Sequence, residues 1–127
     1  MASPGESARK VLLVEDEVLV AMVATDNLNE LGFEVVEATT VRAALHEAAG
    51  HAQFEFALVD LGLPDRPGEE LVAELMAMRP GLPIIIASGY AEDILRGRIK
   101  CADRFTFLKK PYDLAGLQSA INAVART

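Results

Sequence analysis

The sequence has little of what secreted, membrane-spanning or nucleic-acid-binding proteins need. Its 127 residues contain one cysteine, Cys101, which cannot form an internal disulfide and fits a reducing cytoplasm. The longest purely apolar run, residues 18–24, is too short to cross a bilayer, and the first residues lack the apolar core of a signal peptide. With 12 basic against 19 acidic residues, the net charge of −7 lacks the basic footprint of a nucleic-acid surface. We therefore expect a cytoplasmic protein with no direct membrane or nucleic-acid partner.

The length and composition suit a single globular domain. A domain typically has about 100–150 residues, which is enough to bury a core without disulfides. Hydrophobic residues make up 51% of the chain and charged residues 24%, a balance that excludes a disordered chain. We expect a flexible lead-in at residues 1–9 and one folded domain at residues 10–127.

Short apolar runs alternate with amphipathic stretches along the chain. The runs are rich in β-branched or aromatic residues, have the length of strands, and lie at residues 11–14, 33–36, 56–59, 84–87 and 105–108. Between them, apolar residues recur with helical spacing at residues 20–31, 41–48, 71–76 and 114–124. Gly32 and Gly50 are placed as helix C-caps, and Thr40 and Asp113 as N-caps. A further helix is predicted at residues 92–100, where Gly97 interrupts the pattern.

Five successive strand-then-helix units predict an α/β fold with a single, doubly wound, five-stranded parallel sheet. Parallel strands need long right-handed crossovers, which place helices on both faces of the sheet. Four of the runs are almost continuously apolar, as strands that are buried on both faces should be. The second run instead alternates with Glu34 and Glu37, which suits an edge strand. These features favour the flavodoxin-like strand order 2-1-3-4-5.

In an open sheet of this kind, ligands bind beyond the carboxyl ends of the strands. Acidic, hydroxyl and basic side chains follow the predicted strand ends there: Glu15, Asp16 and Glu17 after the first strand, Asp60 at the end of the third, Ser88 at the end of the fourth, and Lys109 and Lys110 at the end of the fifth.

Most of these side chains have a plain structural explanation when each is taken alone. Glu15 and Asp16 suit the positive end of the first helix, and Ser88 suits the N-cap of the fourth. The lysines suit a solvated surface. Asp60 is different, because it follows an apolar run in the strand that is predicted to be most central. A buried, unpaired carboxylate costs several kcal/mol, so something must offset its burial.

The combination of these groups favours phosphoryl-transfer chemistry. Three carboxylates at adjacent strand ends repel one another, and a hard divalent cation with oxygen ligands removes that repulsion. Mg²⁺ typically uses one or two carboxylates together with phosphate oxygens. In such a site an acid is the nucleophile, the cation and an ammonium group neutralise the phosphoryl oxygens, and a hydroxyl donates a hydrogen bond.

These motifs resemble the receiver domain of two-component response regulators, from about residue 10 to the end of the chain. Residues 11–17 resemble its first strand with the acidic pair, residues 60–68 its phosphoacceptor loop, residues 87–89 its hydroxyl motif, and residues 107–111 its aromatic residue and Lys-Pro pair. Asp60 lies 44 residues after Asp16, Ser88 lies 28 residues after Asp60, and Lys110 lies 22 residues after Ser88. All three spacings are typical of the family.

The resemblance implies that the protein is a phosphoacceptor rather than an enzyme, with autophosphotransfer and slow autodephosphorylation only. Asp60 would take a phosphoryl group from a phosphohistidine of a sensor histidine kinase or a histidine phosphotransfer protein. Lys110, preferred to Lys109 because it directly precedes proline, and Ser88 would bind the phosphoryl oxygens. Mg²⁺, with Mn²⁺ as an alternative, would be held by Glu15, Asp16, Asp60 and the backbone carbonyl of Gly62.

The resemblance also implies a conformational switch. Ser88 would move toward the phosphoryl group and Phe107 would rotate into the vacated space. The surface formed by the fourth helix, fifth strand and fifth helix would then change for an unknown downstream protein. Tyr90 is expected to cover the site in part and to slow hydrolysis, and the Lys110–Pro111 peptide bond is expected to be cis. We expect a monomer or a weak dimer.

Three other functions agree less well with the sequence than a phosphoacceptor receiver does. An FMN carrier of the same fold needs a phosphate-binding first loop, which three acidic residues would repel. A haloacid-dehalogenase-type phosphohydrolase needs a second acid where Gly62 stands. A pseudo-receiver that only docks to partners is disfavoured because every chemical position is filled. His46 and His51 are interpreted as surface residues, and Cys101 as a structural or incidental thiol. The protein is expected to be a stand-alone regulator or the receiver of a larger one.

Overall fold

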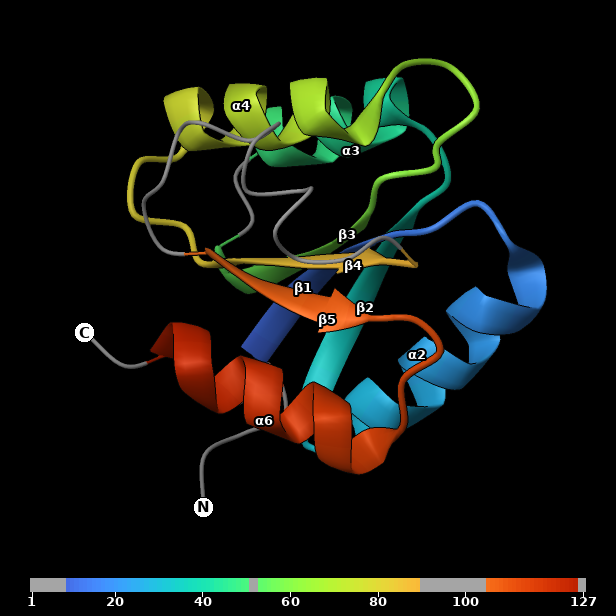
Figure 1. Cartoon of the computed structure of the whole chain (residues 1–127). Helices are drawn as coiled ribbons and strands as arrows, with labels where there is room; N and C mark the ends of the chain where they lie inside the picture. Colours follow the sequence, from blue (N-terminus) through green and yellow to red (C-terminus); the bar gives the residue numbers. More distant parts are fainter. Residues whose placement is uncertain (1–8, 51–52, 90–104, 126–127) are drawn as a thin grey trace.

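The computed structural model describes residues 9–50, 53–89 and 105–125 of the chain. Five strands form one sheet in the order β2-β1-β3-β4-β5, and every neighbouring pair is parallel (Figure 1). The predicted fold class and strand order are therefore confirmed. The strands are β1 (Arg9–Val14), β2 (Phe33–Ala38), β3 (Phe54–Asp60), β4 (Ile84–Ser88) and β5 (Phe105–Lys109).

Helices cover both faces of the sheet, as the crossover argument requires (Figure 1). Helices α3 and α4 lie over one face and α2 and α6 over the other, and each pair encloses its own apolar cluster against the strands. The helices in the described residues are α2 (Val18–Glu30), α3 (Val41–Ala49), α4 (Gly68–Met78) and α6 (Leu114–Ala125). Among them, none combines the length and the apolar character that crossing a membrane requires.

Several predictions fall on residues that the structure does not describe. The helix expected at residues 92–100 lies among them, together with Tyr90, His51 and Cys101. Strand β1 begins at Arg9, one residue before the expected start of the folded domain. His46, on α3, is exposed as expected.

Burial agrees with the sequence patterns for four strands but not for β5, which was predicted to be buried on both faces and is half-buried over three of its five residues because it is the other edge strand. The whole of β4 is buried, and the last four residues of β1 are buried as well. Glu34 and Glu37 on β2 are exposed, which confirms β2 as the edge strand. Asp60 ends β3, the middle strand of the five. The acid that needs an explanation therefore lies at the centre of the carboxyl edge.

The helix ends follow the predicted capping residues. Thr40 accepts the N–H of Ala43 at 2.9 Å, and Asp113 accepts the N–H of Gly116 at 2.8 Å. Gly32 follows α2 with φ of 95°, a conformation that residues with a side chain rarely adopt. Gly50 is the C-cap residue of α3.

The buried face of α2 differs from the expected one. The periodicity predicted that Val20 and Leu31 would lie with Ala24 and Leu28; Leu31 does pack against their apolar cluster, but Val20 is only half-buried and is not part of it. The small side chain of Ala21 is buried instead. Because this stretch is apolar on several sides, the pattern alone could not fix which residues turn inward.

Candidate functional site

Three acidic side chains meet at the carboxyl edge, where β1 and β3 are neighbouring strands. Glu15 follows β1 and Asp60 ends β3, and these two residues are 3% and 7% exposed. Glu15, Asp16 and Asp60 each offer one carboxylate oxygen, and these oxygens lie within 4.8 Å of one another. The predicted acids are thus brought together, with two of them withdrawn from water.

The start of α2 accounts for only part of this cluster. The N-cap residue of α2 is Glu17, whose side chain makes no capping hydrogen bond. Glu15 accepts the N–H of Glu17 through Oε2 at 3.2 Å, while its other oxygen, Oε1, faces Lys110. Helix capping therefore explains one oxygen of Glu15 and leaves the rest of the acidic cluster to another role.

Lys110 is the cation that contacts this cluster. Its Nζ lies 3.2 Å from Oε1 of Glu15 and 3.3 Å from Oδ1 of Asp60. Glu17, whose contact with the lysine was not predicted, lies at 3.9 Å. Lys109 is exposed, in agreement with the choice of Lys110. The peptide bond between Lys110 and Pro111 is cis, as the resemblance implied.

The pKa shifts show how the charges compete. Burial raises the pKa of Glu15, and the negative charge of Asp60 adds to it, against the opposing effects of the Glu17 N–H and of Lys110. For Lys110, burial alone would lower the pKa, but the charges of Asp60 and Glu15 outweigh it and the pKa is raised. Burial, helped by the charge of Glu15, also raises the pKa of Tyr112 to about 12. Among the described residues, the site therefore gathers three carboxyl groups around one ammonium group.

A cavity of about 330 Å³ opens at Asp60. The second carboxylate oxygen of Asp60, Oδ2, lies on the side of Gly62. A Cβ added to Gly62 would lie 3.7 Å from this oxygen. Ser88 is 5% exposed, and its main-chain carbonyl accepts the N–H of Lys110 at 2.8 Å. The residues that line the cavity are Glu17, Asp60, Leu61, Gly62, Pro67, Glu69, Ser88, Gly89 and Lys110.

Phe107 lies on β5 and is half-buried. Its ring meets that of Phe105 edge-on, with the centroids 5.4 Å apart. The two rings pack against the apolar cluster under α3 and α4. The aromatic residue expected to act in the switch therefore has its ring in a packed environment.

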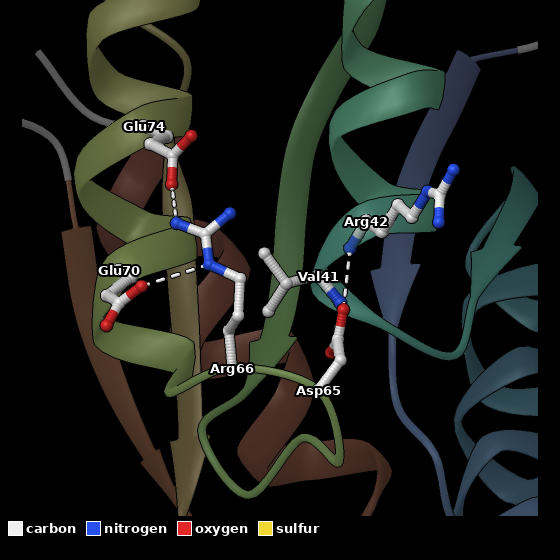
Figure 2. Close-up of polar contacts among 6 residues, drawn as sticks. All are labelled: Val41, Arg42, Asp65, Arg66, Glu70 and Glu74. Carbon is white, nitrogen blue, oxygen red and sulfur yellow. Dashed lines mark hydrogen bonds and ion pairs between the residues drawn. The ribbon is translucent and has the colours of Figure 1, made fainter.

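The loop between β3 and α4 contains two charged residues whose roles were not predicted (Figure 2). Asp65 accepts main-chain N–H groups at the start of α3, and Arg66 forms ion pairs with Glu70 and Glu74 of α4. A Pro-Asp pair in a loop indicates a turn, and the sequence holds no local signal that its carboxylate reaches a helix start 24 residues earlier.

Comparison with known proteins decides the family. The family model for the response regulator receiver domain matches residues 11–122. The chain belongs to this family.

Two curated relatives are longer than this chain and match it over part of their length. It is 34% identical over 113 residues to the sensor kinase CckA of Brucella abortus, covering 87% of this chain and 12% of the relative. It is 32% identical over 120 residues to the transcriptional regulatory protein PdtaR of Mycobacterium tuberculosis, covering 93% of this chain and 58% of the relative. The receiver domain thus spans less than two thirds of either relative.

One solved structure with the same fold contains a phosphorylated aspartic acid. The structure of a response regulator protein from Burkholderia pseudomallei, with a phosphorylated aspartic acid, calcium ion and citrate, is 29% identical. The match has a TM-score of 0.79 and covers 91% of this chain and 68% of that one. The cluster of Glu15, Asp16 and Asp60 fits the metal site of a receiver domain.

Proposed function

We propose that Asp60 is the phosphoacceptor of this receiver domain and takes its phosphoryl group from a phosphohistidine of a histidine kinase or histidine phosphotransfer protein. The observation that carries the proposal is the position of Asp60. Its carboxylate ends the central strand, lines the cavity, and has one oxygen paired with Lys110. The other oxygen lies on the side of Gly62 and would act as the nucleophile.

The donor set suits a hard divalent cation. Carboxylate oxygens are ligands that Mg²⁺ prefers, and Mn²⁺ accepts the same set. The acidic cluster holds more negative charge than Lys110 balances, which favours a further cation. When bound, Mg²⁺ would neutralise the phosphoryl oxygens and lower the repulsion between donor and acceptor. It would be held by Glu15, Asp16, Asp60 and the backbone carbonyl of Gly62.

The transfer itself needs little from the protein besides position and charge. One carboxylate oxygen of Asp60 forms a bond to phosphorus as the phosphorus–nitrogen bond of the donor breaks. The electron pair of that bond stays on the imidazole nitrogen of the donor, which then takes up a proton. Lys110 and Ser88 would bind the phosphoryl oxygens while the group moves from the donor nitrogen to Asp60.

An exposed apolar surface next to the site supports a protein as the donor. Val18, Leu19, Met22 and Val23 of α2 are between 55% and 76% exposed. A cavity of about 500 Å³ joins part of this surface to Lys110, Pro111 and Tyr112. Because clustered apolar side chains at a surface mark interaction sites, we assign this face to the partner that presents the phosphohistidine.

The outcome of transfer would be a switch. A phosphoryl group adds roughly −1.5 to −2 charges and strong acceptor oxygens at Asp60. Ser88 would move toward them and Phe107 would take a new position in its packing. The surface formed by β5 and α6, together with the fourth helix that the sequence predicts outside the described residues, would then favour a downstream protein. Tyr90 as a partial cover that slows hydrolysis remains a prediction.

The test is phosphorylation by a small-molecule donor, which requires no known partner. With acetyl phosphate and Mg²⁺, we expect the intact mass of the wild-type protein to rise by one phosphoryl group. The Asp60→Asn variant should gain none, and neither protein should gain any when the metal is chelated. A wild-type protein that stays unmodified would instead indicate a pseudo-receiver that acts by docking alone, and turnover of a phosphate ester would indicate a phosphohydrolase.

A further inference from the structure

The loop between β3 and α4 reaches across to the start of a different helix. The Asp65 carboxylate accepts the N–H of Val41 through Oδ1 at 2.9 Å and the N–H of Arg42 through Oδ2 at 3.0 Å (Figure 2). The N–H groups in the first turn of a helix have no partner within the helix. Thr40 satisfies the next one, that of Ala43. The start of α3 is thus capped twice by a residue that lies in the phosphoacceptor loop.

The same helix start is also connected to the acidic loop after β1. Ala38, at the end of β2 and two residues before Thr40, accepts the N–H of Glu15 at 3.0 Å. The segment from Ala38 to Val41 therefore has Glu15 bonded at one end and Asp65 at the other. It bridges the two loops that supply the proposed metal ligands.

The base of the phosphoacceptor loop is closed separately. The N–H of Gly68 donates to the carbonyl of Leu61 at 3.1 Å, and a Cβ at Gly68 would stand 2.5 Å from the Cα of Leu61. Arg66 fixes the end of the loop to α4 through Glu70 and Glu74. Asp65 adds a further connection, from this loop to the start of α3, the helix that precedes β3.

We infer that Asp65 is a positioning residue for the proposed metal and phosphoryl site, acting by holding the loop that carries Gly62 against α3. The inference rests on the proposed function. Gly62 lies two residues after Asp60 and three before Asp65. Glycine has the greatest backbone freedom, so its carbonyl needs an external anchor to keep one direction. Contacts that orient metal ligands typically change metal affinity by about 10- to 100-fold when they are removed.

A matched control exists at the opposite end of α3. Arg79, which follows α4, donates from its guanidinium to the carbonyls of Ala48 and Gly50, both at 3.0 Å. Asp65 and Arg79 therefore each make two hydrogen bonds at one end of α3, and each side chain carries the charge that the helix dipole favours at that end. Arg79 also lies over the ring of Phe54, at 5.2 Å from the ring centroid, so its removal should destabilise the fold at least as much.

The experiment compares Asp65→Asn, Asp65→Ala and Arg79→Ala with the wild type. Mg²⁺ alone is titrated by calorimetry, thermal unfolding is recorded, and amide exchange at Gly62 and Leu63 is measured in metal-free protein. We expect the alanine variants at both ends to unfold at lower temperature. Asp65→Ala should bind Mg²⁺ about tenfold more weakly and exchange faster in the loop. Asp65→Asn should lie between, because its amide oxygen can still accept one N–H. Arg79→Ala should keep both values within about twofold of the wild type.

Two results would overturn the inference. Asp65→Ala could bind Mg²⁺ as the wild type does and keep its loop protected, or Arg79→Ala could weaken Mg²⁺ binding as strongly as Asp65→Ala. A wild-type protein that binds no Mg²⁺ and takes up no phosphoryl group would count against the proposed function instead. The exchange rates in metal-free protein would still show whether Asp65 orders the loop.

Discussion

At the scale of single residues, the site is defined by a charge that Lys110 cannot balance alone. Its ammonium group lies between Glu15 and Asp60 at 3.2 and 3.3 Å, with Glu17 at 3.9 Å. Burial raises the pKa of Glu15, with the charge of Asp60 adding to it, so ionising this group is harder than in water. A second cation at the site would relieve the same repulsion, which is why the local charges favour a metal.

Asp65 shows the opposite behaviour, and its titration gives a prediction. Its pKa is lowered, chiefly because it accepts the N–H of Val41, so the folded state favours the ionised form. The stabilisation is complete above the ordinary aspartate pKa of about 3.9 and is lost as the pH falls through the lowered value. The difference in melting temperature between the wild type and Asp65→Asn should therefore be constant from pH 7 to about pH 5 and shrink below about pH 4.

Thermal unfolding followed by circular dichroism at fixed ionic strength measures this difference. Because the carboxylate is exposed, added salt should reduce the difference at neutral pH. A difference that persists unchanged to about pH 3 would show that the ionised carboxylate does not cap α3.

At the scale of elements, the loop between β3 and α4 depends on close contact at Gly68. A Cβ there would meet main-chain atoms of Leu61 and Asp60 at 2.5 to 3.0 Å, and backbone cannot move aside as a flexible side chain can. Gly68→Ala should lower the free energy of unfolding by about 1–3 kcal/mol, as overpacking typically does. It should also shift Leu61 and weaken Mg²⁺ binding.

Gly62→Ala is the matched control for Gly68→Ala. It adds the same methyl group to the same loop, where the nearest atom would be Oδ2 of Asp60 at an ordinary contact of 3.7 Å. Urea denaturation should show a loss of less than about 0.5 kcal/mol, as for most substitutions away from special features. Equal losses in the two variants would contradict a steric role for Gly68.

The elements also show how far sequence could predict this molecule. Strand order and the meeting of Glu15, Asp60 and Lys110 were predictable, because parallel strands bring their carboxyl ends to one edge. The hydrogen bond that Asp65 accepts from Val41 was not predictable, since it depends on where a loop lies relative to a helix that begins 24 residues earlier. The exposed side of α2 was not predictable either, because apolar residues occupy several of its sides and only packing decides which turn inward.

At the scale of the whole molecule, the acidic cluster that the proposed function requires lowers the stability of the metal-free fold. A chain with net charge −7 gathers three acids at one edge and buries two of them. Such an arrangement destabilises the folded chain unless a cation joins it, and sites of this kind are where natural proteins give up stability for activity. The fold tolerates the cluster because two separate apolar clusters, one on each face, hold the sheet.

Asp60→Asn should therefore make the metal-free protein more stable while it abolishes phosphoryl uptake. The amide oxygen can still accept a hydrogen bond from Lys110, whereas the Asp60 charge, which adds to the effect of burial in raising the pKa of Glu15, is gone. We expect a gain of about 0.5–2 kcal/mol in the free energy of unfolding without metal.

For the wild type, Mg²⁺ at about a hundred times its dissociation constant should add about 2.7 kcal/mol to the free energy of unfolding, and Asp60→Asn should gain much less. Glu37→Gln removes one charge from an exposed position on β2 and should change neither quantity. Urea denaturation with and without Mg²⁺ compares the three proteins. If Asp60→Asn proved less stable than the wild type in metal-free solution, the pairing with Lys110 would outweigh the repulsion from Glu15, and the charge conflict could not be what favours a metal here.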